Sequence, residues 1–323
     1  MFLLIIKLNM VCIFLKIHSK DDLKAYQSSQ LGGKIHRSLL NLKHLNYLDL
    51  SYNNFGGSKI PIFLSSMGSL RHLNLSNAGF EGMIPYQLRN LSNLHYLGLE
   101  NYALYANNFQ WLSGLSLLQH PHMSQVYLQK VFDFLHVTSK LPSMLELHVS
   151  GCGLQFFSPI PRVNFSSLAI LDLSDNNFND SLIPTWVLGL NNLVSLDLNR
   201  NNLQCPIPPS LQNMTSLRNL DLSSNNFNGT IPNWIYGFSR LEFLNLQDNN
   251  LQGTISSAIG NLTSAISIDL SFNELEGKVP RSLGNLCNLR ALDFSKLKCG
   301  QEISEILETL LGCISDGLEL LYV

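Results

Sequence analysis

A row of acidic and amide side chains is the feature of this sequence most able to do chemistry. One such position recurs every 24 to 26 residues, between two apolar residues. The row reads Asp49, Asn74, Gly98, His122, His148, Asp172, Asp197, Asp221, Asn245, Asp269 and Asp293. Carboxylates at matching positions of neighbouring segments could act as an acid–base pair or bind calcium. The aspartates belong, however, to a recurring L-D-L-S phrase, in which serine and the backbone can satisfy them. We therefore favour solvated side chains and expect no catalytic residue, no metal site and no cofactor.

Histidines in the middle of the chain offer a second kind of chemistry. His120 and His122 flank Pro121, and His148 occupies the position of His122 one segment later. Clustered imidazoles could bind a metal or respond to acid pH. The proline shows that this stretch departs from the regular pattern, so we favour solvated residues in an irregular segment.

Outward-facing aromatic and charged residues are our candidates for contact with a peptide or protein, because exposed aromatic side chains are costly unless a partner covers them. The alternative to ligand contact is ordinary sequence variation on a large exposed surface. The candidate residues fall into two groups. The N-terminal patch consists of Tyr47, Tyr52, His72, His95, Tyr96 and Glu100. The C-terminal patch consists of Arg200, Arg218, Glu242, Phe243, Phe272 and Arg290.

A repeated segment must position these residues. Its first strand residue recurs with the same 24- to 26-residue step, which is the leucine-rich-repeat period. In each L-x-L the two leucines point inward on a short strand and their neighbours point outward. A following asparagine, such as Asn225, can bond the backbone of its own and the next coil, and Gly229 with Ile231-Pro232 turns the chain. The first apolar strand residues of the successive repeats are Leu48, Leu73, Leu97, Pro121, Leu147, Leu171, Leu196, Leu220, Leu244, Ile268 and Leu292.

This pattern predicts an α/β solenoid, a right-handed leucine-rich-repeat superhelix with short parallel strands on its concave face. We divide the chain into five parts. They are an apolar segment and weak signal-peptide match at 1–21, N-terminal repeats at 22–101, irregular repeats at 102–146, regular repeats at 147–297 and a degenerate, truncated repeat at 298–323.

Charge and cysteine content narrow the function. Lys plus Arg number 21 against 23 Asp plus Glu, so we expect no nucleic-acid partner. None of the six cysteines forms a C-x-x-C pair, which disfavours zinc and thioredoxin-type chemistry. Cys287 and Cys313 would lie at about the same height on neighbouring coils, so we expect a disulfide between them. Cys152 occupies a buried asparagine position and is expected to stay reduced.

Asparagine sequons are the remaining motif, and glycans on them would indicate an extracellular protein. The sequon Asn74 faces the strand side, where a glycan would block contact, so we leave it out. The expected glycosylation sites are Asn90, Asn164, Asn179, Asn213, Asn228 and Asn261.

The amino-acid sequences of the repeats resemble the plant leucine-rich repeat. The segments LNLSNAGFEGMIP, LDLSSNNFNGTIP and IDLSFNELEGKVP carry its consensus. LNYLDLSYNNFGG, WLSGLSLL, KLPSMLELHVSGCGL and QEISEILETLLGC are similar to receptor-like proteins of the type that perceives a fungal ethylene-inducing xylanase. The resemblance covers about residues 22–323. It implies a plant-defence glycoprotein at the extracellular side of the plasma membrane that signals by recruiting a co-receptor kinase.

The function we expect is therefore non-enzymatic recognition of a peptide or protein ligand, possibly microbial, by a truncated receptor-like ectodomain. Two alternatives stay open at this point. One is a secreted inhibitor of microbial cell-wall-degrading enzymes, which resembles inhibitors built on the same repeat. The other is a non-functional receptor fragment, which Pro121, Leu297 and the apolar ending LELLYV favour.

Overall fold

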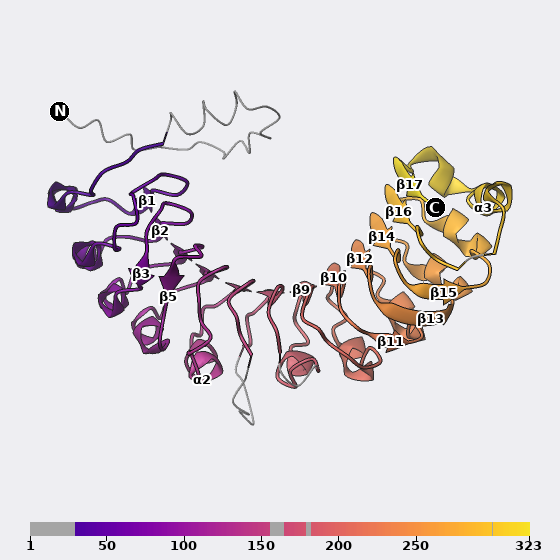
Figure 1. Ribbon diagram of the computed structural model, residues 1–323, viewed down its shortest axis with the longest axis horizontal. Coiled ribbons are helices and arrows are strands. Elements are labelled where there is room, and N and C mark those ends of the chain that lie inside the picture. The colour runs from indigo at the N-terminus through magenta and orange to yellow at the C-terminus, as the bar shows by residue number, and fades with distance from the viewer. Residues whose placement is uncertain (1–29, 156–164, 179–181, 299) are drawn as a thin grey trace. The chain divides into compact units, whose positions relative to one another are not determined.

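The computed structural model describes residues 30–155, 165–178, 182–298 and 300–323 (Figure 1). The chain divides into two compact units. Unit 1 comprises Met1–Met144 and unit 2 comprises Leu145–Val323. The apolar segment 1–21 lies outside the described residues, as do Asn164 and Asn179.

Unit 1 is built from coils that each contain a three-residue strand on one side and a short helical segment on the other (Figure 1). Its parallel sheet consists of β1 (Tyr47–Asp49), β2 (His72–Asn74), β4 (Tyr96–Gly98) and β6 (His120–His122). A two-stranded sheet is formed by β3 (Gly82–Met83) and β5 (Leu104–Tyr105). The helical segments are η1 (Arg37–Asn41), η2 (Ile62–Ser66), η3 (Tyr86–Asn90), η4 (Gln110–Gly114) and α2 (Phe134–Thr138).

Unit 2 repeats the same plan with longer runs of regular coils. Its parallel sheet consists of β7 (Glu146–His148), β8 (Ile170–Asp172), β9 (Ser195–Asp197), β10 (Asn219–Asp221), β12 (Phe243–Asn245), β14 (Ser267–Asp269), β16 (Ala291–Asp293) and β17 (Leu320–Tyr322). A second parallel sheet consists of β11 (Asn228–Gly229), β13 (Asn250–Thr254) and β15 (Glu274–Glu276). The helical segments are η5 (Val187–Gly189), η6 (Pro209–Asn213), η7 (Asn233–Gly237), η8 (Ser257–Asn261), η9 (Arg281–Asn285), α3 (Ile303–Thr309) and η10 (Cys313–Asp316).

The strand register confirms the predicted repeat phase within each unit. Leu48 pairs with Leu73, and Leu220 pairs with Leu244, each mark opposite the next. Pro121 takes the leucine position of β6 opposite Leu97, as the spacing predicts. These central strand residues are buried, because a single coil cannot enclose its own apolar face and neighbouring coils share one core.

Buried asparagines hold the turn after each regular strand. The Asn225 amide donates to the carbonyls of Leu198, Leu222 and Ser223 at 2.9, 3.1 and 2.9 Å. Its Oδ1 accepts the backbone N–H groups of Asn201 and Leu203, both at 3.0 Å. The prediction that this amide satisfies backbone groups is confirmed, but its partners lie on its own and the preceding coil. The expected bond to the next coil was wrong, because the Asn225 side chain points toward the preceding coil.

Proline and glycine act where the repeat pattern predicts. Pro85, Pro208 and Pro232 precede η3, η6 and η7 with φ between −68° and −72°, which fixes the entry into each helical segment. Gly229, the last residue of β11, adopts φ 75°, a conformation that residues with a side chain rarely adopt.

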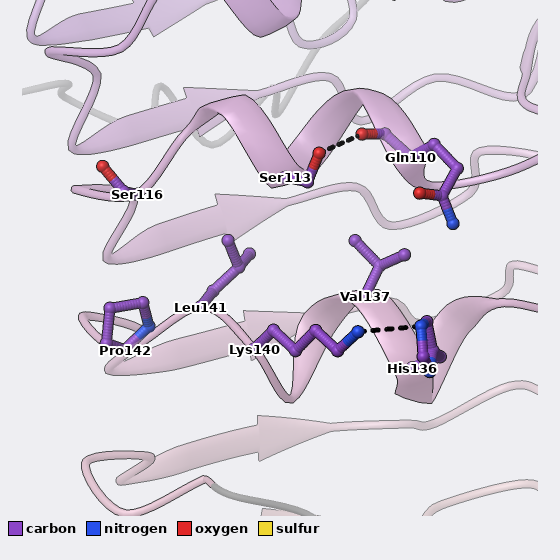
Figure 2. A pocket seen from close by; sticks show the side chains of 8 residues that line it. All are labelled: Gln110, Ser113, Ser116, His136, Val137, Lys140, Leu141 and Pro142. Atoms are coloured by element: carbon purple, nitrogen blue, oxygen red, sulfur yellow. Dashed lines mark hydrogen bonds between the residues drawn. The ribbon is translucent and has the colours of Figure 1, made fainter.

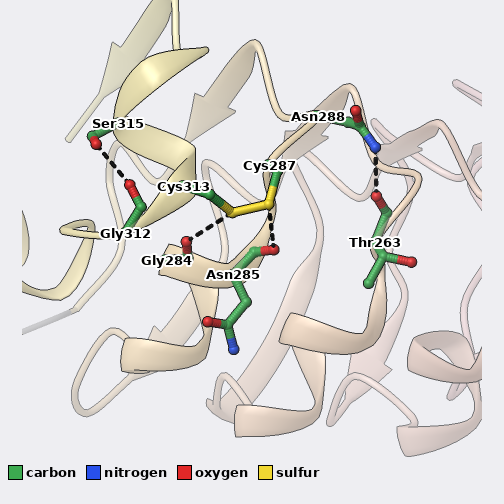
Figure 3. Close-up of a disulfide and its surroundings, with 8 residues drawn as sticks. All are labelled: Thr263, Gly284, Asn285, Cys287, Asn288, Gly312, Cys313 and Ser315. Carbon is green, nitrogen blue, oxygen red and sulfur yellow. Dashed lines mark hydrogen bonds between the residues drawn. A yellow bond between two sulfur atoms is a disulfide. The ribbon is translucent and has the colours of Figure 1, made fainter.

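A disulfide joins two coils of unit 2 (Figure 3). Cys287 follows η9 and Cys313 begins η10, and their Cα atoms are 4.8 Å apart. Cys152 is a buried free thiol and Cys205 a half-buried one. The covalent link ties the coil that contains β16 to the coil that ends in β17.

Candidate functional site

The strand face of each unit is the surface on which a ligand can meet regularly spaced side chains. We define it as the solvent side of the parallel sheet, formed by the residue that precedes each strand, the first and third residue of the strand, and the turn that follows. From β1 to β16 the middle residue of each three-residue strand in these sheets is buried in the core, so the strand-face residues are free to differ without disturbing the fold.

Three residues of the N-terminal patch form an aromatic row in unit 1. The ring centroids of Tyr47 and His72 are 4.0 Å apart and the planes differ by 7°. His72 and Tyr96 follow at 4.1 Å and 10°. The three residues are paired in register as the first residues of β1, β2 and β4, so the strand spacing itself brings the rings into stacking distance.

Gly98 lets the row continue to a fourth ring. A Cβ at Gly98 would lie 2.3 Å from Oδ1 of Asn74, so the third strand position of β4 carries no side chain. Tyr96 tilts to within 5.0 Å of the His122 ring, with 39° between the planes. The row therefore crosses from the first strand position to the third. His122 and Gly98 were missed as parts of this patch, and the glycine in an otherwise polar column was the signal.

His72 is held neutral at the centre of the row. Its Nε2 atom is buried and has no hydrogen-bond partner among the described residues. Burial lowers the pKa of His72, the nearby Asp49 carboxylate partly opposes this, and His120 lowers the pKa further. His72 thus contributes an uncharged ring to the row near neutral pH.

The rest of the N-terminal patch lies beside the row. His95 precedes β4 and its Nδ1 lies 2.8 Å from the carbonyl of Asn93. Tyr52 and Glu100 are in the turns that follow the strands, where the Tyr52 N–H donates to Ser76. The structure places all six predicted residues on the strand face of unit 1 and stacks three of them.

The arginines of the C-terminal patch are ion-paired along the strand face of unit 2. Nη1 of Arg218 lies 2.6 Å from Oε1 of Glu242 on the next coil, so these two predicted residues come together. Arg200 and Arg290 pair with Asp175 at 3.6 Å and with Glu319 at 3.7 Å. Both acidic partners were missed, although Asp175 has the repeat position of Arg200 and Glu319 has that of Arg290.

Phe243 and Phe272 are the exposed apolar part of the C-terminal patch, with 44% and 49% of their surface accessible. Phe272 has φ 54°, as Tyr52 and Arg200 have 56° and 52° at the same place in their repeats. This left-handed position turns each side chain away from the core, and it forms a further column that the sequence pattern did not reveal. Its members without glycine are Tyr52, Asn77, Gln125, Asp175, Arg200, Ser224, Asp248, Phe272 and Lys296.

The carboxylates of the aspartate row accept hydrogen bonds largely from their own coil. Oδ1 of Asp221 accepts the N–H and hydroxyl of Ser223 at 2.9 and 2.5 Å. Asp49, Asp172, Asp269 and Asp293 accept the same pair of bonds from the serine two residues on. This arrangement is the hydrogen-bonded role that the L-D-L-S phrase predicts.

Asp197 departs from that role because Asn199 replaces the serine. Its carboxylate accepts only the Asn199 N–H in this arrangement, at 2.9 Å, while the Asn199 amide donates to Ser223. Burial, together with repulsion from Asp221, Asp172 and Asp175, raises the pKa of Asp197 to about 7. The Asp197 carboxyl therefore titrates near neutral pH, and the missing serine was the sequence signal for it.

His148 and Asp172 lie close together at the start of unit 2. Burial disfavours both charges, but the hydrogen bond and the opposite charge prevail, so the pKa of His148 is raised and that of Asp172 is lowered. His148 Nδ1 lies 3.6 Å from Asp172 Oδ2, and its Nε2 lies 3.5 Å from Glu146. This histidine is paired, not simply solvated as the sequence suggested.

Four of the sequons expected to carry glycans lie within the described residues, off the strand face. Asn90, Asn213 and Asn261 are exposed last residues of η3, η6 and η8, and exposed Asn228 begins β11. Asn74 instead lies on the strand face, where its amide points to Asp49 at 3.4 Å. Across the parts of the chain that the structure describes, no helix combines the length and apolarity needed to cross a membrane.

Comparisons with known proteins agree with this architecture. Leucine rich repeat family models match residues 166–227 and 207–251, and a second such model matches 44–67, 69–91 and 264–286. The chain is 39% identical over 196 residues to the receptor-like protein EIX1 of Solanum lycopersicum, which covers 58% of this chain and 19% of that protein. It is 34% identical over 178 residues to EIX2 of the same plant, covering 54% and 17%.

Among solved structures, the chain is similar to the plant peptide hormone receptor RGFR1 in complex with RGF2. The TM-score is 0.68 at 27% identity, over 87% of this chain and 45% of that one. The chain spans about one fifth of the length of the curated relatives that it matches.

Proposed function

We propose that this chain, a leucine-rich-repeat protein of the plant receptor-like type, recognises a peptide or protein ligand through its strand faces. The repeated residues build the solenoid, while the outward columns differ from coil to coil. A ligand that lies across several strands would contact one side chain from each coil, so affinity and selectivity would come from the columns together.

The aromatic row is the observation that carries this proposal. Tyr47 has 46% of its surface exposed although it lies in a regular strand. Stacking holds the rings of Tyr47, His72 and Tyr96 in one arrangement, so little side-chain entropy remains to be lost on binding. Tyrosine is also enriched among the residues that dominate interface energies.

The C-terminal patch offers a second contact region of a different kind. Its arginines pair with acids at exposed positions, and such pairs are worth at most about 1 kcal/mol, so a ligand carboxylate could replace the acid at small cost. Phe243 and Phe272 supply apolar contact beside them. This composition suits an acidic, partly apolar segment of a folded protein.

The ligand we propose is a microbial protein, namely a fungal ethylene-inducing xylanase, and the site of action is the extracellular side of the plasma membrane. Recruitment of a co-receptor kinase belongs to the same proposal, and it rests on resemblance to receptor-like proteins. The exposed sequons Asn90, Asn213, Asn228 and Asn261 support an extracellular setting, since glycans there would leave the strand faces open.

Binding of the secreted chain to a purified fungal xylanase tests the proposal. We expect Tyr96→Ala to weaken binding at least about tenfold, because it removes the ring on which both His72 and His122 pack. Tyr86→Ala is the matched control, since Tyr86 is an exposed tyrosine of η3 on the helical side of the same unit. Equal weakening by both variants would contradict recognition through the strand face.

The xylanase activity of the complex separates a receptor from an inhibitor. A receptor ectodomain is expected to bind without abolishing hydrolysis of xylan, because its contacts serve recognition only. Complete loss of hydrolysis at saturating chain would support an inhibitor and contradict the receptor proposal. Absence of any binding would exclude this ligand.

A further inference from the structure

A groove on the helical side of unit 1 is separate from the strand face (Figure 2). It lies between η4 and α2 and has a volume of about 260 Å³. Gln110 and Ser113 line one side, and His136, Lys140 and Leu141 line the other. The groove is therefore the size of one ring-shaped small molecule, near the lower end of ligand pockets.

Local packing explains why the groove opens here. On one side η4 packs closely against η3. The space is so small that a Cβ added at Gly114 would lie 2.3 Å from the carbonyl oxygen of Arg89, and only glycine fits there. On the other side the neighbouring segment is the α-helix α2, whereas η1 to η4 are 3-10 helices. Asp133 joins α2 to η4 at one end, accepting the Phe109 N–H and the Gln110 amide, both at 2.9 Å. The two segments are held together at that end and leave a wedge beyond it.

The charge of the groove is positive. Lys140 Nζ lies 2.8 Å from Nε2 of His136, and because an ammonium can only donate, this nitrogen is the acceptor. The ammonium keeps two further N–H donors for a ligand. No carboxylate is among the described residues that line the groove, and the oxygens of the neighbouring Asp133 are engaged by Phe109 and Gln110.

The other walls combine acceptors with an apolar surface. The Ser113 hydroxyl donates to the Gln110 carbonyl at 2.6 Å, so its lone pairs face outward as acceptors. The Gln110 amide nitrogen is held by Asp133, which leaves its Oε1 as an acceptor. Val137 and Leu141 are buried and point toward η4, as Figure 2 shows. A fitting ligand carries one negative charge, several hydroxyl donors and a C–H face.

We propose that this groove binds a single sugar-acid residue, with its carboxylate on Lys140, its hydroxyls on Ser113 and Gln110, and its C–H face against Leu141. One ammonium selects one carboxylate, and the acceptors select hydroxyls over a bare inorganic anion. The site is independent of the strand face and of the ligand proposed for it.

Ligand-observed NMR on the secreted full chain provides the test. Sodium D-galacturonate is expected to bind with a Kd of about 1 mM, and uncharged D-galactose at least about tenfold more weakly. Lys140→Met keeps the aliphatic stem, removes the charge and is expected to weaken galacturonate at least about tenfold. Lys130→Met is the matched control, because Lys130 is exposed on the same coil but does not line the groove.

The other outcomes each decide against the proposal. Equal binding of galactose and galacturonate would remove the role of the carboxylate. Displacement of galacturonate by equimolar sulfate would identify an anion site without sugar selectivity. Unchanged binding in Lys140→Met, with an unchanged melting temperature, would place the sugar elsewhere. Tyr96→Ala is expected to leave galacturonate binding unchanged, so this test and the strand-face test fail separately.

Discussion

Single residues decide where charge resides on the strand face. In five coils the serine two residues after the aspartate donates both its N–H and its hydroxyl to the carboxylate. In the coil of β9 that serine is Asn199, and the burial of Asp197 between Asp172 and Asp221 is no longer offset by a hydroxyl. One substitution in a repeated phrase thus changes the ionisation of a surface that otherwise looks uniform.

Asp197→Asn tests this account through pH. The ordinary pKa of 3.8 is raised to about 7 in the folded chain. Between these values the folded chain keeps a proton that the unfolded chain releases, so stability falls as pH rises through this window and stays lowered above it. We expect the variant to have a higher denaturation midpoint than wild type at pH 8, and the same midpoint at pH 4. Asp248→Asn, an exposed change in the same unit, is the control; a constant difference across pH would contradict the assignment.

For His72 in unit 1 the expected pH dependence of stability is the opposite of that for Asp197, and His72→Phe tests it. The pKa of His72 is lowered from 6.5, so below pH 6.5 the unfolded chain takes up a proton that the folded chain does not, and stability falls on acidification. Phenylalanine keeps a ring between Tyr47 and Tyr96 but cannot titrate. We expect the variant to lose less stability than wild type between pH 7.5 and pH 5, measured by chemical denaturation. Identical losses would show that His72 is not the group responsible.

At the scale of the element, the repeat works because each coil satisfies the backbone of its neighbour. Asn225 serves two coils at once, with three donor bonds and two acceptor bonds. The same arrangement recurs through Asn176, Asn249 and Asn273. Leu297 occupies the equivalent position after β16 and has no side-chain group that could make these hydrogen bonds.

Asn225→Ala is expected to destabilise unit 2 by about 3 kcal/mol or more, because several buried backbone groups lose their partners together. Asn226→Ala is the matched control one residue away, where the side chain is exposed. Hydrogen exchange should show the loss concentrated in the coils of β9 and β10, since repeats interact chiefly with their neighbours. Equal effects of the two variants would contradict the asparagine ladder.

The fold was largely predictable because its causes are local and periodic. The spacing of leucine, asparagine, glycine and proline predicted the positions of eleven strands, from β1 to β16 in the main sheet of each unit, including Pro121 in β6. The row of Tyr47, His72 and Tyr96 was predictable as a column, but not as a stack. Ring stacking, the Arg200–Asp175 pair and the titration of Asp197 depend on side-chain conformations across coils, which a sequence period does not specify.

At the scale of the whole molecule, a covalent link adds to packing between coils. The disulfide between Cys287 and Cys313 encloses a segment with a sequence separation of 26. Closing a loop of this length in the unfolded chain is worth about 3 kcal/mol by the chain-entropy model. The coils of β16 and β17 therefore gain stability that their packing alone does not provide.

The double variant Cys287→Ser with Cys313→Ser is expected to lower the free energy of unfolding of unit 2 by about this amount. A reducing agent should lower the melting temperature of wild type and leave the double variant unchanged. Cys205→Ser, which changes a free cysteine, is the control. A response to reductant that persists in the double variant would contradict the assigned pairing.

The central claim is that the strand face is the surface this molecule keeps open for a ligand. Glycan mapping by mass spectrometry of the secreted wild-type chain tests it most directly, because no ligand has to be known. The account predicts occupied sites at Asn90, Asn213, Asn228 and Asn261, where the side chains are exposed off the strand face, and an unmodified Asn74. A glycan on Asn74, or a secreted chain without glycans at those four positions, would contradict it.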